Sequence, residues 1–227
     1  AIAFSLGVRL DAIRQGLRTF GSTFFQAPGR MNVFDEHPFK VLFDYGHNAH
    51  AVGAMADLAQ RLDVKGRRIV VLAAPGDRRD DDIADIARAA AGKFDHYIVR
   101  RDDGLRGRGE DEIPRLLEQT LIAAGVDAAQ IARIPDEQEA IDTALRMGQA
   151  GDLLLIFADA LTRSWKQIIK FRPEGVAAPV RTPVADAPAL PEAQAQAREA
   201  ELRAMMEGAV RAVRGYWYAG GNEAWVR

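Results

Sequence analysis

Five residues with chemically useful side chains stand together at 44–48, which read Asp-Tyr-Gly-His-Asn and follow the apolar run 41–43. A carboxylate at the end of a buried strand can accept the two hydroxyls of a ribose, and His47 and Asn48 add donors and flat faces suited to a nucleotide. The pattern suggests half of a nucleotide site. Two plainer interpretations stay open, since Asp44 could serve the start of the next helix and His47 could be a hydrogen-bonded loop histidine. His47 and His50 also have the spacing of a metal pair, but a chain with no cysteine and four histidines does not favour zinc.

A second candidate segment is 74–82, Ala-Pro-Gly-Asp-Arg-Arg-Asp-Asp-Asp, which follows an apolar run. A proline and a glycine would form a turn, and Asp80 or Asp81 would cap the helix after it. The free N–H groups of that helix and the guanidinium of Arg78 or Arg79 would then point into one crevice, which is an anion-binding arrangement. The alternative is that the arginines only form surface ion pairs.

The third segment, 100–112, reads Arg-Arg-Asp-Asp-Gly-Leu-Arg-Gly-Arg-Gly-Glu-Asp-Glu. Five of its thirteen residues are acidic and four are arginines, so it could recognise a ligand that carries both charges. Its glycines would allow the backbone to approach that ligand closely. A solvated, mobile loop is the alternative explanation of the same composition.

The elements that must position these segments alternate along the chain, as short apolar runs separated by segments with apolar residues every three to four positions. Strands apolar on both faces and separated by helices predict a parallel sheet covered on both sides, a doubly wound α/β fold of the Rossmann-like kind. Ligands in such folds bind at the carboxyl ends of the strands. The expected strands are 40–44, 68–74, 95–99, 131–134 and 152–158, and the expected helices are 49–63, 81–92, 110–124 and 136–148.

The segments before and after this region have a different character. Residues 1–20 read as two helical pieces broken at Gly7, and 21–39 as a loop with a short strand. Residues 173–191 contain five prolines, which predicts a linker or an extended wrap. Residues 192–227 predict an appended helix followed by an aromatic tail with Trp217 and Trp225.

Bulk composition narrows the class of protein. With 30 basic and 32 acidic residues the net charge is -2, so the whole chain has no electrostatic signature of a nucleic-acid or membrane partner. No apolar run approaches the roughly 20 residues that span a bilayer. We expect a globular protein of the cytoplasm, and the opening at Ala1 suggests a piece of a longer product.

Taken together, and in their order along the chain, these segments resemble the C-terminal domain of the Mur ligase superfamily, whose members are ATP-dependent enzymes that form amide bonds. The matching residues are Pro28-Gly29-Arg30, the segment 44–48, and Gly76-Asp77-Arg78. Within the superfamily the resemblance is greatest to the C-terminal part of the cyanophycin synthetases, through APGDRRDDDI, FDHYIVRRDDGLRGRGEDEI, IPDEQEAIDTAL and GDLLLIFADALTRSW. It extends from residue 1 to about residue 172.

The resemblance implies roles for two groups of residues. The group expected at ATP is Arg30, Asp44, Tyr45, His47 and Asn48. The group expected at the amino-acid substrate is Arg78, Asp103, Arg106, Arg108 and Glu110. Which arginine or acid binds which part of the substrate stays open, and no metal ligand is expected in this chain.

The resemblance also implies an activity, which is the addition of arginine to the side-chain carboxylate of a polyaspartate acceptor through an acyl phosphate. ATP and Mg²⁺ would be the cofactors. Another Mur-type ligase, acting on a peptidoglycan precursor or forming folylpolyglutamate, is an alternative. A non-catalytic nucleotide-binding or oligomerisation module is a second, and a homo-oligomer is compatible with each.

A phosphate-binding loop of the form Gly-x-x-x-x-Gly-Lys-Ser/Thr does not occur in the 227 residues. The resemblance places that loop, and most of the metal binding, on a central domain upstream in the same polypeptide, so the chain alone is expected to be inactive. The expected divisions are the end of the central domain and a connector at 1–27, the Mur-type domain at 28–172, a linker at 173–191, and the appended helix and tail at 192–227.

Overall fold

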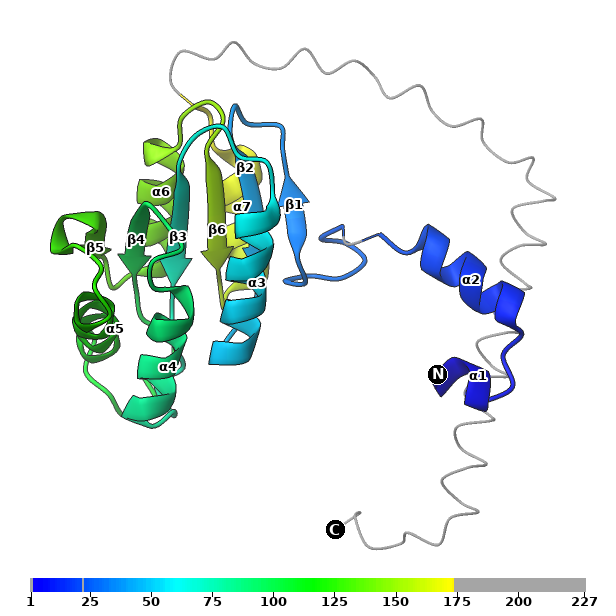
Figure 1. Cartoon of the computed structure of the whole chain (residues 1–227), viewed down its shortest axis with the longest axis horizontal. Helices are drawn as coiled ribbons and strands as arrows, with labels where there is room; N and C mark the ends of the chain where they lie inside the picture. The colour runs from blue at the N-terminus through cyan, green and yellow to red at the C-terminus, as the bar shows by residue number, and fades with distance from the viewer. Residues whose placement is uncertain (1, 22, 174–227) are drawn as a thin grey trace, which may run out of the picture. The chain divides into compact units, whose positions relative to one another are not determined.

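The computed structural model describes residues 2–21 and 23–173. The chain divides into two units, and the unit that runs from Phe20 to Pro179 contains the sheet. Its elements alternate between strands and helices as the sequence predicts (Figure 1). They are β1 (Asn32–Phe34), β2 (Lys40–Asp44), α3 (Ala49–Arg61), β3 (Arg68–Leu72), α4 (Asp80–Ala90), β4 (His96–Val99), α5 (Glu112–Ala123), the 3-10 helix η1 (Ala128–Gln130), β5 (Ile131–Arg133), α6 (Glu137–Met147), β6 (Leu153–Phe157) and α7 (Leu161–Lys170).

The six strands form one sheet in the order β1-β2-β6-β3-β4-β5. β1 is antiparallel to β2, and every other pairing is parallel. The register pairs Asp44 with Phe157 at the ends of β2 and β6, and Leu72 with Val99 at the ends of β3 and β4. The carboxyl ends of the five parallel strands therefore lie along one edge of the sheet.

Helices cover both faces of the sheet (Figure 1). α3, α4 and α5 pack on one face, where Val52, Ile83 and Leu117 join alternate strand residues in one apolar cluster. α6 and α7 pack on the other, where Ile141 and Ile168 join the remaining strand residues. Burial on both faces explains why a strand such as β6 is apolar at every position. The predicted doubly wound, mostly parallel fold is confirmed.

The first 19 residues belong to the other unit. They contain α1 (Ile2–Ser5) and α2 (Leu10–Thr19), separated by Gly7 with a φ of 80°. This is the predicted break into two helical pieces. No helix within residues 2–21 and 23–173 is long and apolar enough to cross a membrane.

The element predictions need two corrections. α4 begins after Arg79, so Asp80 and Asp81 lie inside its first turn, and neither is the N-cap. α7 was not among the predicted helices, although Leu161, Trp165 and Ile168 have helical spacing and pack on the sheet. The predictions for 174–227, which include most of the linker, the appended helix and the two tail tryptophans, lie outside the described residues.

Candidate functional site at the carboxyl edge of the sheet

Asp44 is the last residue of β2, and it connects the segment 44–48 to the turn that follows 28–30. Its side chain is 9% exposed, and Oδ2 accepts a hydrogen bond of 2.8 Å from the backbone N–H of Met31. The Gly29 carbonyl accepts from the Tyr45 N–H at 2.9 Å. The predicted motif at 28–30 therefore lies against the segment 44–48, as two halves of one structure.

Gly29 is required at this junction for two reasons. Its φ is 66°, a left-handed conformation that disfavours a side chain. An added Cβ would also come within 2.7 Å of the Leu161 side chain. The Gly29 N–H donates to Asn32 Oδ1 at 2.8 Å, which completes the turn. The backbone thus presents Arg30 at a fixed position beside Tyr45.

Three side chains from this junction gather at one place. The guanidinium carbon of Arg30 lies 5.9 Å from the ring centroid of Tyr45, within cation-π range. The rings of Tyr45 and His47 are 5.1 Å apart at 51°, and His47 Nδ1 lies 3.1 Å from the Tyr45 carbonyl oxygen. Two flat rings are suited to the adenine base of ATP, and a cation is suited to its phosphates.

Asn48, the fifth residue predicted to bind ATP, has a local structural task. It is the N-cap of α3, and its Oδ1 accepts from the Ala51 N–H at 2.9 Å. This bond satisfies one of the free donors at the start of the helix. The capping contact accounts for the residue type at this position.

In the second segment, Asp77 and Arg106 form an ion pair at 2.7 Å that joins the loop after β3 to the loop after β4. Arg79 pairs with Asp82 on the surface at 2.8 Å, as the plainer interpretation expected. Arg78 is exposed, and no described residue forms an ion pair or hydrogen bond with its guanidinium. Arg78 is therefore the arginine of this segment whose charge is available to a ligand.

Arg108 fastens the third segment to the second. Its guanidinium donates to the carbonyl oxygens of Gly76 at 2.9 Å and Arg78 at 2.6 Å. It also forms ion pairs with Asp80 at 2.8 Å and Glu112 at 2.7 Å. These bonds engage all three guanidinium nitrogens within the protein, which is the arrangement of a structural clasp.

The two loops approach each other closely at Gly76. A Cβ at that position would come within 2.4 Å of the Leu105 carbonyl oxygen, so only glycine fits. Next to this contact, Arg106 has a φ of 50°, an uncommon value for a residue with a side chain. The backbone around Arg106 is thus set by the contact between the loops.

The other predicted substrate residues are placed differently. Asp103 Oδ2 pairs with Arg163 of α7 at 2.7 Å. Glu110 is exposed and lines a separate depression, which also contains Asp80 and Arg108. Glu110 and Arg108 therefore lie away from the depression that contains Tyr45 and His47.

A buried ionic network beneath the loops was not predicted. Arg100, directly after β4, is 1% exposed and Glu137, at the start of α6, is fully buried. Their Nη2 and Oε2 atoms are 2.7 Å apart. Arg100 Nη1 lies 2.9 Å from Oδ1 of Asp159, which follows β6. The sequence signal for this network was weak: Arg100 and Asp159 are charged residues that each follow an apolar predicted strand.

The network shifts the pKa values of its two carboxyl groups in opposite directions. Burial raises the pKa of the Glu137 carboxyl, and its interaction with Asp159 raises it further, against the charge of Arg100. Burial also raises the pKa of Asp159, but its interaction with Glu137 and the charge of Arg100 outweigh burial and lower it to about 2. Asp159 therefore carries its charge throughout the physiological pH range.

One depression collects residues from the ends of four elements. It is lined by Tyr45, Gly46, His47, Ala73, Pro75, Arg100, Asp102, Phe157, Ala158 and Asp159. Burial raises the pKa of Asp102 in this depression, and the negative charge of Asp159 adds to the effect. Gly46 packs directly against Phe157, because a Cβ at position 46 would come within 2.7 Å of the Phe157 ring. The depression is thus lined by residues from all three predicted segments, 44–48, 74–82 and 100–112.

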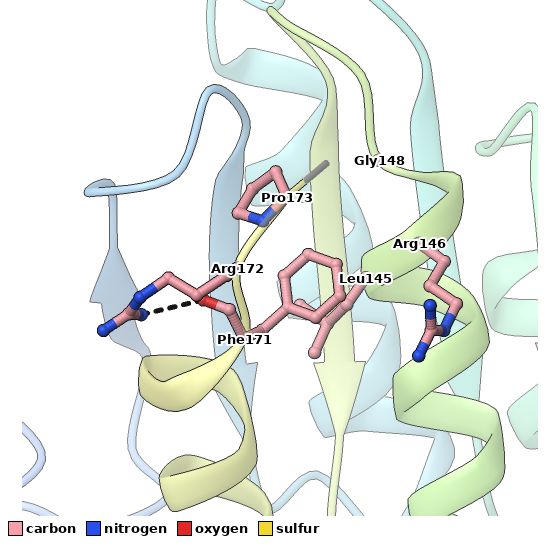
Figure 2. Close-up of a pocket in the computed structure, with 6 residues that line it drawn as sticks. All are labelled: Leu145, Arg146, Gly148, Phe171, Arg172 and Pro173. Carbon is pink, nitrogen blue, oxygen red and sulfur yellow. Dashed lines mark hydrogen bonds between the residues drawn. The ribbon is translucent and has the colours of Figure 1, made fainter. Parts of the chain in front are cut away.

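A different pocket lies where α6 and α7 end, at the opposite edge of the sheet from the carboxyl ends of the strands (Figure 2). Figure 2 shows the side chains of Leu145 and Phe171 next to each other, while the Arg172 guanidinium turns away and donates to the Phe171 carbonyl at 2.9 Å. None of the predicted site residues lines this pocket.

The profile of the family described as "Mur ligase, glutamate ligase domain" matches residues 29–160. Cyanophycin synthetase of Geminocystis herdmanii is 38% identical over 169 residues, which cover 74% of this chain and 19% of that protein. Cyanophycin synthetase of a Nostoc species is 39% identical over 173 residues, 75% of this chain and 18% of that protein. The chain thus spans about a fifth of the length of these relatives.

Solved structures agree on the fold. The folylpolyglutamate synthase of Mycobacterium tuberculosis complexed with ADP has a TM-score of 0.53 at 19% identity and covers 72% of this chain and 36% of that one. UDP-N-acetylmuramate-alanine ligase of Thermotoga maritima has a TM-score of 0.52 at 16% identity, with 74% and 34% covered.

Proposed function

The chain belongs to the Mur ligase, glutamate ligase domain family, and from this premise we propose that it is the ATP- and amino-acid-contacting lobe of an ATP-dependent amide ligase. The observation that carries the proposal is a depression into which the predicted nucleotide segment and the charged third loop both bring side chains. The relatives at 38% and 39% identity, both named cyanophycin synthetase, support the choice of reaction.

For the nucleotide, we assign the adenosine end to the junction of 28–30 with 44–48. Tyr45 and His47 would border the base, and the Arg30 guanidinium beside Tyr45 would reach the phosphates. Asp44 would accept from the ribose. Oδ2 already accepts from the Met31 N–H, so Oδ1 and the second lone pair of Oδ2 would be the acceptors for the ribose. Asn48 would contribute by fixing the start of α3.

For the amino acid, we assign the α-carboxylate to Arg78 or Arg106. The Arg78 charge is available, and Arg106 could exchange its exposed partner Asp77 for a substrate carboxylate. A basic side chain on the substrate would face carboxylates of the third loop, of which Asp103 is bound to Arg163. Arg108 would act by holding the two loops together.

The reaction we propose has two steps. The side-chain carboxylate of an aspartate acceptor attacks the γ-phosphorus of ATP, which forms an acyl phosphate and releases ADP. The α-amino group of arginine then attacks the acyl carbon, the phosphate leaves with the electrons of the C–O bond, and the amine loses a proton as the amide forms. Fixed cations and N–H donors stabilise the negative charge that develops in both steps.

Mg²⁺ would neutralise charge on the phosphates of ATP. Within the described residues no group of three or more His, Cys, Asp or Glu side chains is placed to hold a metal ion. We assign no metal ligand to this chain and derive no step through the metal. The proposal places the phosphate loop and the metal site on the part of the polypeptide that corresponds to the rest of the longer relatives.

The test uses the complete gene product that contains this chain. ADP release is measured with a polyaspartate-type acceptor and with arginine, lysine, glutamate, diaminopimelate or alanine. Turnover that requires both the acceptor and arginine supports the proposal. Equal turnover with alanine would refute the arginine assignment, and turnover only with glutamate or diaminopimelate would assign the chain to another ligase of the family.

A further inference from the structure

We propose that Asp159, together with buried Arg100, is a positioning residue that holds the loop 101–111 in the geometry needed for the amino-acid substrate. The proposal rests on the proposed function for its effect on catalysis. Its structural half is independent of that function.

The loop is held at its start by a short series of bonds. Asp159 Oδ2 accepts from the backbone N–H of Asp103 at 3.0 Å. Asp159 Oδ1 is in turn held by Arg100 Nη1 at 2.9 Å. The same Nη1 donates to the carbonyl oxygen of Arg101 at 2.6 Å. The first residues of the loop are therefore fixed directly to the ends of β4 and β6.

Burial makes this attachment rigid. Arg100 Nη2 also donates to the Phe157 carbonyl at 2.9 Å, and Glu137 accepts from the Asp159 N–H at 3.0 Å. A buried ion pair is often no more stabilising than a packed apolar group, but removing one partner leaves a buried charge uncompensated. The network can thus adopt few other arrangements, and it fixes Asp159 in both position and charge.

A short piece of chain connects the bond at Asp103 to Arg106, a residue proposed to bind the substrate carboxylate. Asp103 and Arg106 are separated by two residues, and the far end of this piece is set by the contact of Leu105 with Gly76 and by the Asp77–Arg106 pair. Without the bond to Asp159, the near end would be held less firmly, by the Arg100 bond to the Arg101 carbonyl and by the partly exposed pair of Asp103 with Arg163. Arg106 would then sample positions that do not match the carboxylate of the amino-acid substrate.

The same strand offers a matched control at its other end. Asp152 directly precedes β6, is 3% exposed at its side chain and pairs with Arg67 at 2.7 Å. Like Asp159, it also accepts from backbone N–H groups, those of Arg67 at 2.7 Å and Gln149 at 3.0 Å. Asp152→Ala removes the same kinds of bond at the edge of the sheet away from the depression.

The experiment compares Asp159→Ala, Asp159→Asn and Asp152→Ala in the complete gene product. Amide hydrogen exchange reports on the loop, and the KM values for arginine and ATP report on catalysis. In Asp159→Ala we expect faster exchange at the Asp103 amide and a KM for arginine raised about tenfold or more, with the KM for ATP changed less than about twofold. Asp159→Asn keeps an oxygen that can accept from Asp103, so its effects should be smaller. Asp152→Ala should lower the Tm without either change.

Unchanged protection of the Asp103 amide in Asp159→Ala would overturn the proposal, whatever the enzyme does. Faster exchange with an unchanged KM for arginine would overturn its catalytic half. Equal KM changes in Asp159→Ala and Asp152→Ala would identify general destabilisation and overturn it as well. If the wild-type protein shows no arginine-dependent turnover, the proposed function fails, while the exchange comparison still decides whether Asp159 positions the loop. Asp159→Asn supplies both readouts if Asp159→Ala does not fold.

Discussion

The backbone N–H of Met31 donates a 2.8 Å hydrogen bond to Oδ2 of Asp44, although the two residues are thirteen positions apart. Met31 has a φ of 48°, an uncommon conformation for a residue with a side chain. A bond from an N–H to a carboxylate is stronger than one between neutral groups. The residue proposed to bind the ribose thus also supports the turn that carries Arg30.

Because Asp44 has both roles, its substitution should affect both stability and the KM for ATP. Asp44→Ala should lower the free energy of unfolding by about 1.5–3 kcal/mol, the usual range for a lost bond to a charged group. It should also raise the KM for ATP. Asp44→Asn keeps an acceptor for Met31 and should retain more stability than Asp44→Ala. Denaturant unfolding and steady-state kinetics measure the two effects, and a fully stable Asp44→Ala protein would contradict the structural role.

Gly29 and Gly53 should respond in opposite ways to alanine. Gly29→Ala combines a left-handed backbone with a Cβ 2.7 Å from Leu161, so we expect a loss of about 1–3 kcal/mol in the free energy of unfolding. Gly53 lies inside α3, where an added Cβ would be 3.8 Å from Ala89, an ordinary contact. Gly53→Ala should therefore be neutral or stabilise by up to about 1 kcal/mol. Thermal unfolding of both variants tests the pair, and equal losses would contradict the assignment.

Arg78 and Arg108 should separate substrate binding from loop stability. Arg108→Met removes bonds to the carbonyl oxygens of Gly76 and Arg78, so it should lower the Tm and make the loops more accessible to a protease. Arg78→Met removes an exposed charge that has no ion-pair partner in the described part of the chain, so it should leave the Tm unchanged and raise the KM for the amino acid. A raised Michaelis constant in Arg108→Met with an unchanged Tm would reassign Arg108 to the substrate.

His37 should make stability depend on pH in the weakly acidic range. It is 9% exposed among Phe34, Phe39 and Phe171, and Nε2 lies 2.9 Å from the Ile168 carbonyl oxygen. Burial lowers the pKa of His37 below its usual value, against the opposing effect of the bond to Ile168. A lowered folded-state pKa means that the unfolded chain binds the proton more readily. This contribution to stability is therefore present above about pH 6.5 and is lost as the pH falls through the lower folded-state value.

His37→Phe keeps a ring in the same surroundings and removes the titrating group. As the pH falls from about 7 to 5, the unfolding free energy of the wild-type protein should decrease relative to that of this variant. Denaturant titrations at several pH values measure it. A difference that does not vary with pH would show that His37 does not titrate differently in the two states.

The sequence was sufficient for the fold where both faces of the sheet are buried. β2, β3, β4 and β6 each contain an unbroken run of apolar or aromatic residues, and helical spacing between them leaves few other arrangements. α7 was missed because its apolar positions, Leu161, Trp165 and Ile168, are few, and because they gain their meaning from the sheet face that they cover. The cap of α4 was misplaced because three consecutive aspartates offer several equivalent starts.

The site was less predictable because its connections are non-local. Asp159 and Glu137 are 22 positions apart, Asp159 and Arg100 are 59 apart, and each is an ordinary charged residue in sequence. Composition alone also could not separate Arg78, whose charge faces no partner among the described residues, from Arg108, whose donors are used within the protein. The distinction depends on which carbonyl groups the fold brings within reach.

The bond between Asp159 and the Asp103 amide has a consequence for engineering. Residues 101–111 look like an exchangeable cassette, and transplanting them from a relative would be the natural way to change the amino acid accepted. Their anchorage, however, comes from Arg100 and from Asp159, a residue more than fifty positions downstream. Because these two residues bind backbone atoms at positions 101 and 103, a transplanted cassette should stay anchored in a host that has both Arg100 and Asp159, and should lose this anchorage in a host in which either is replaced.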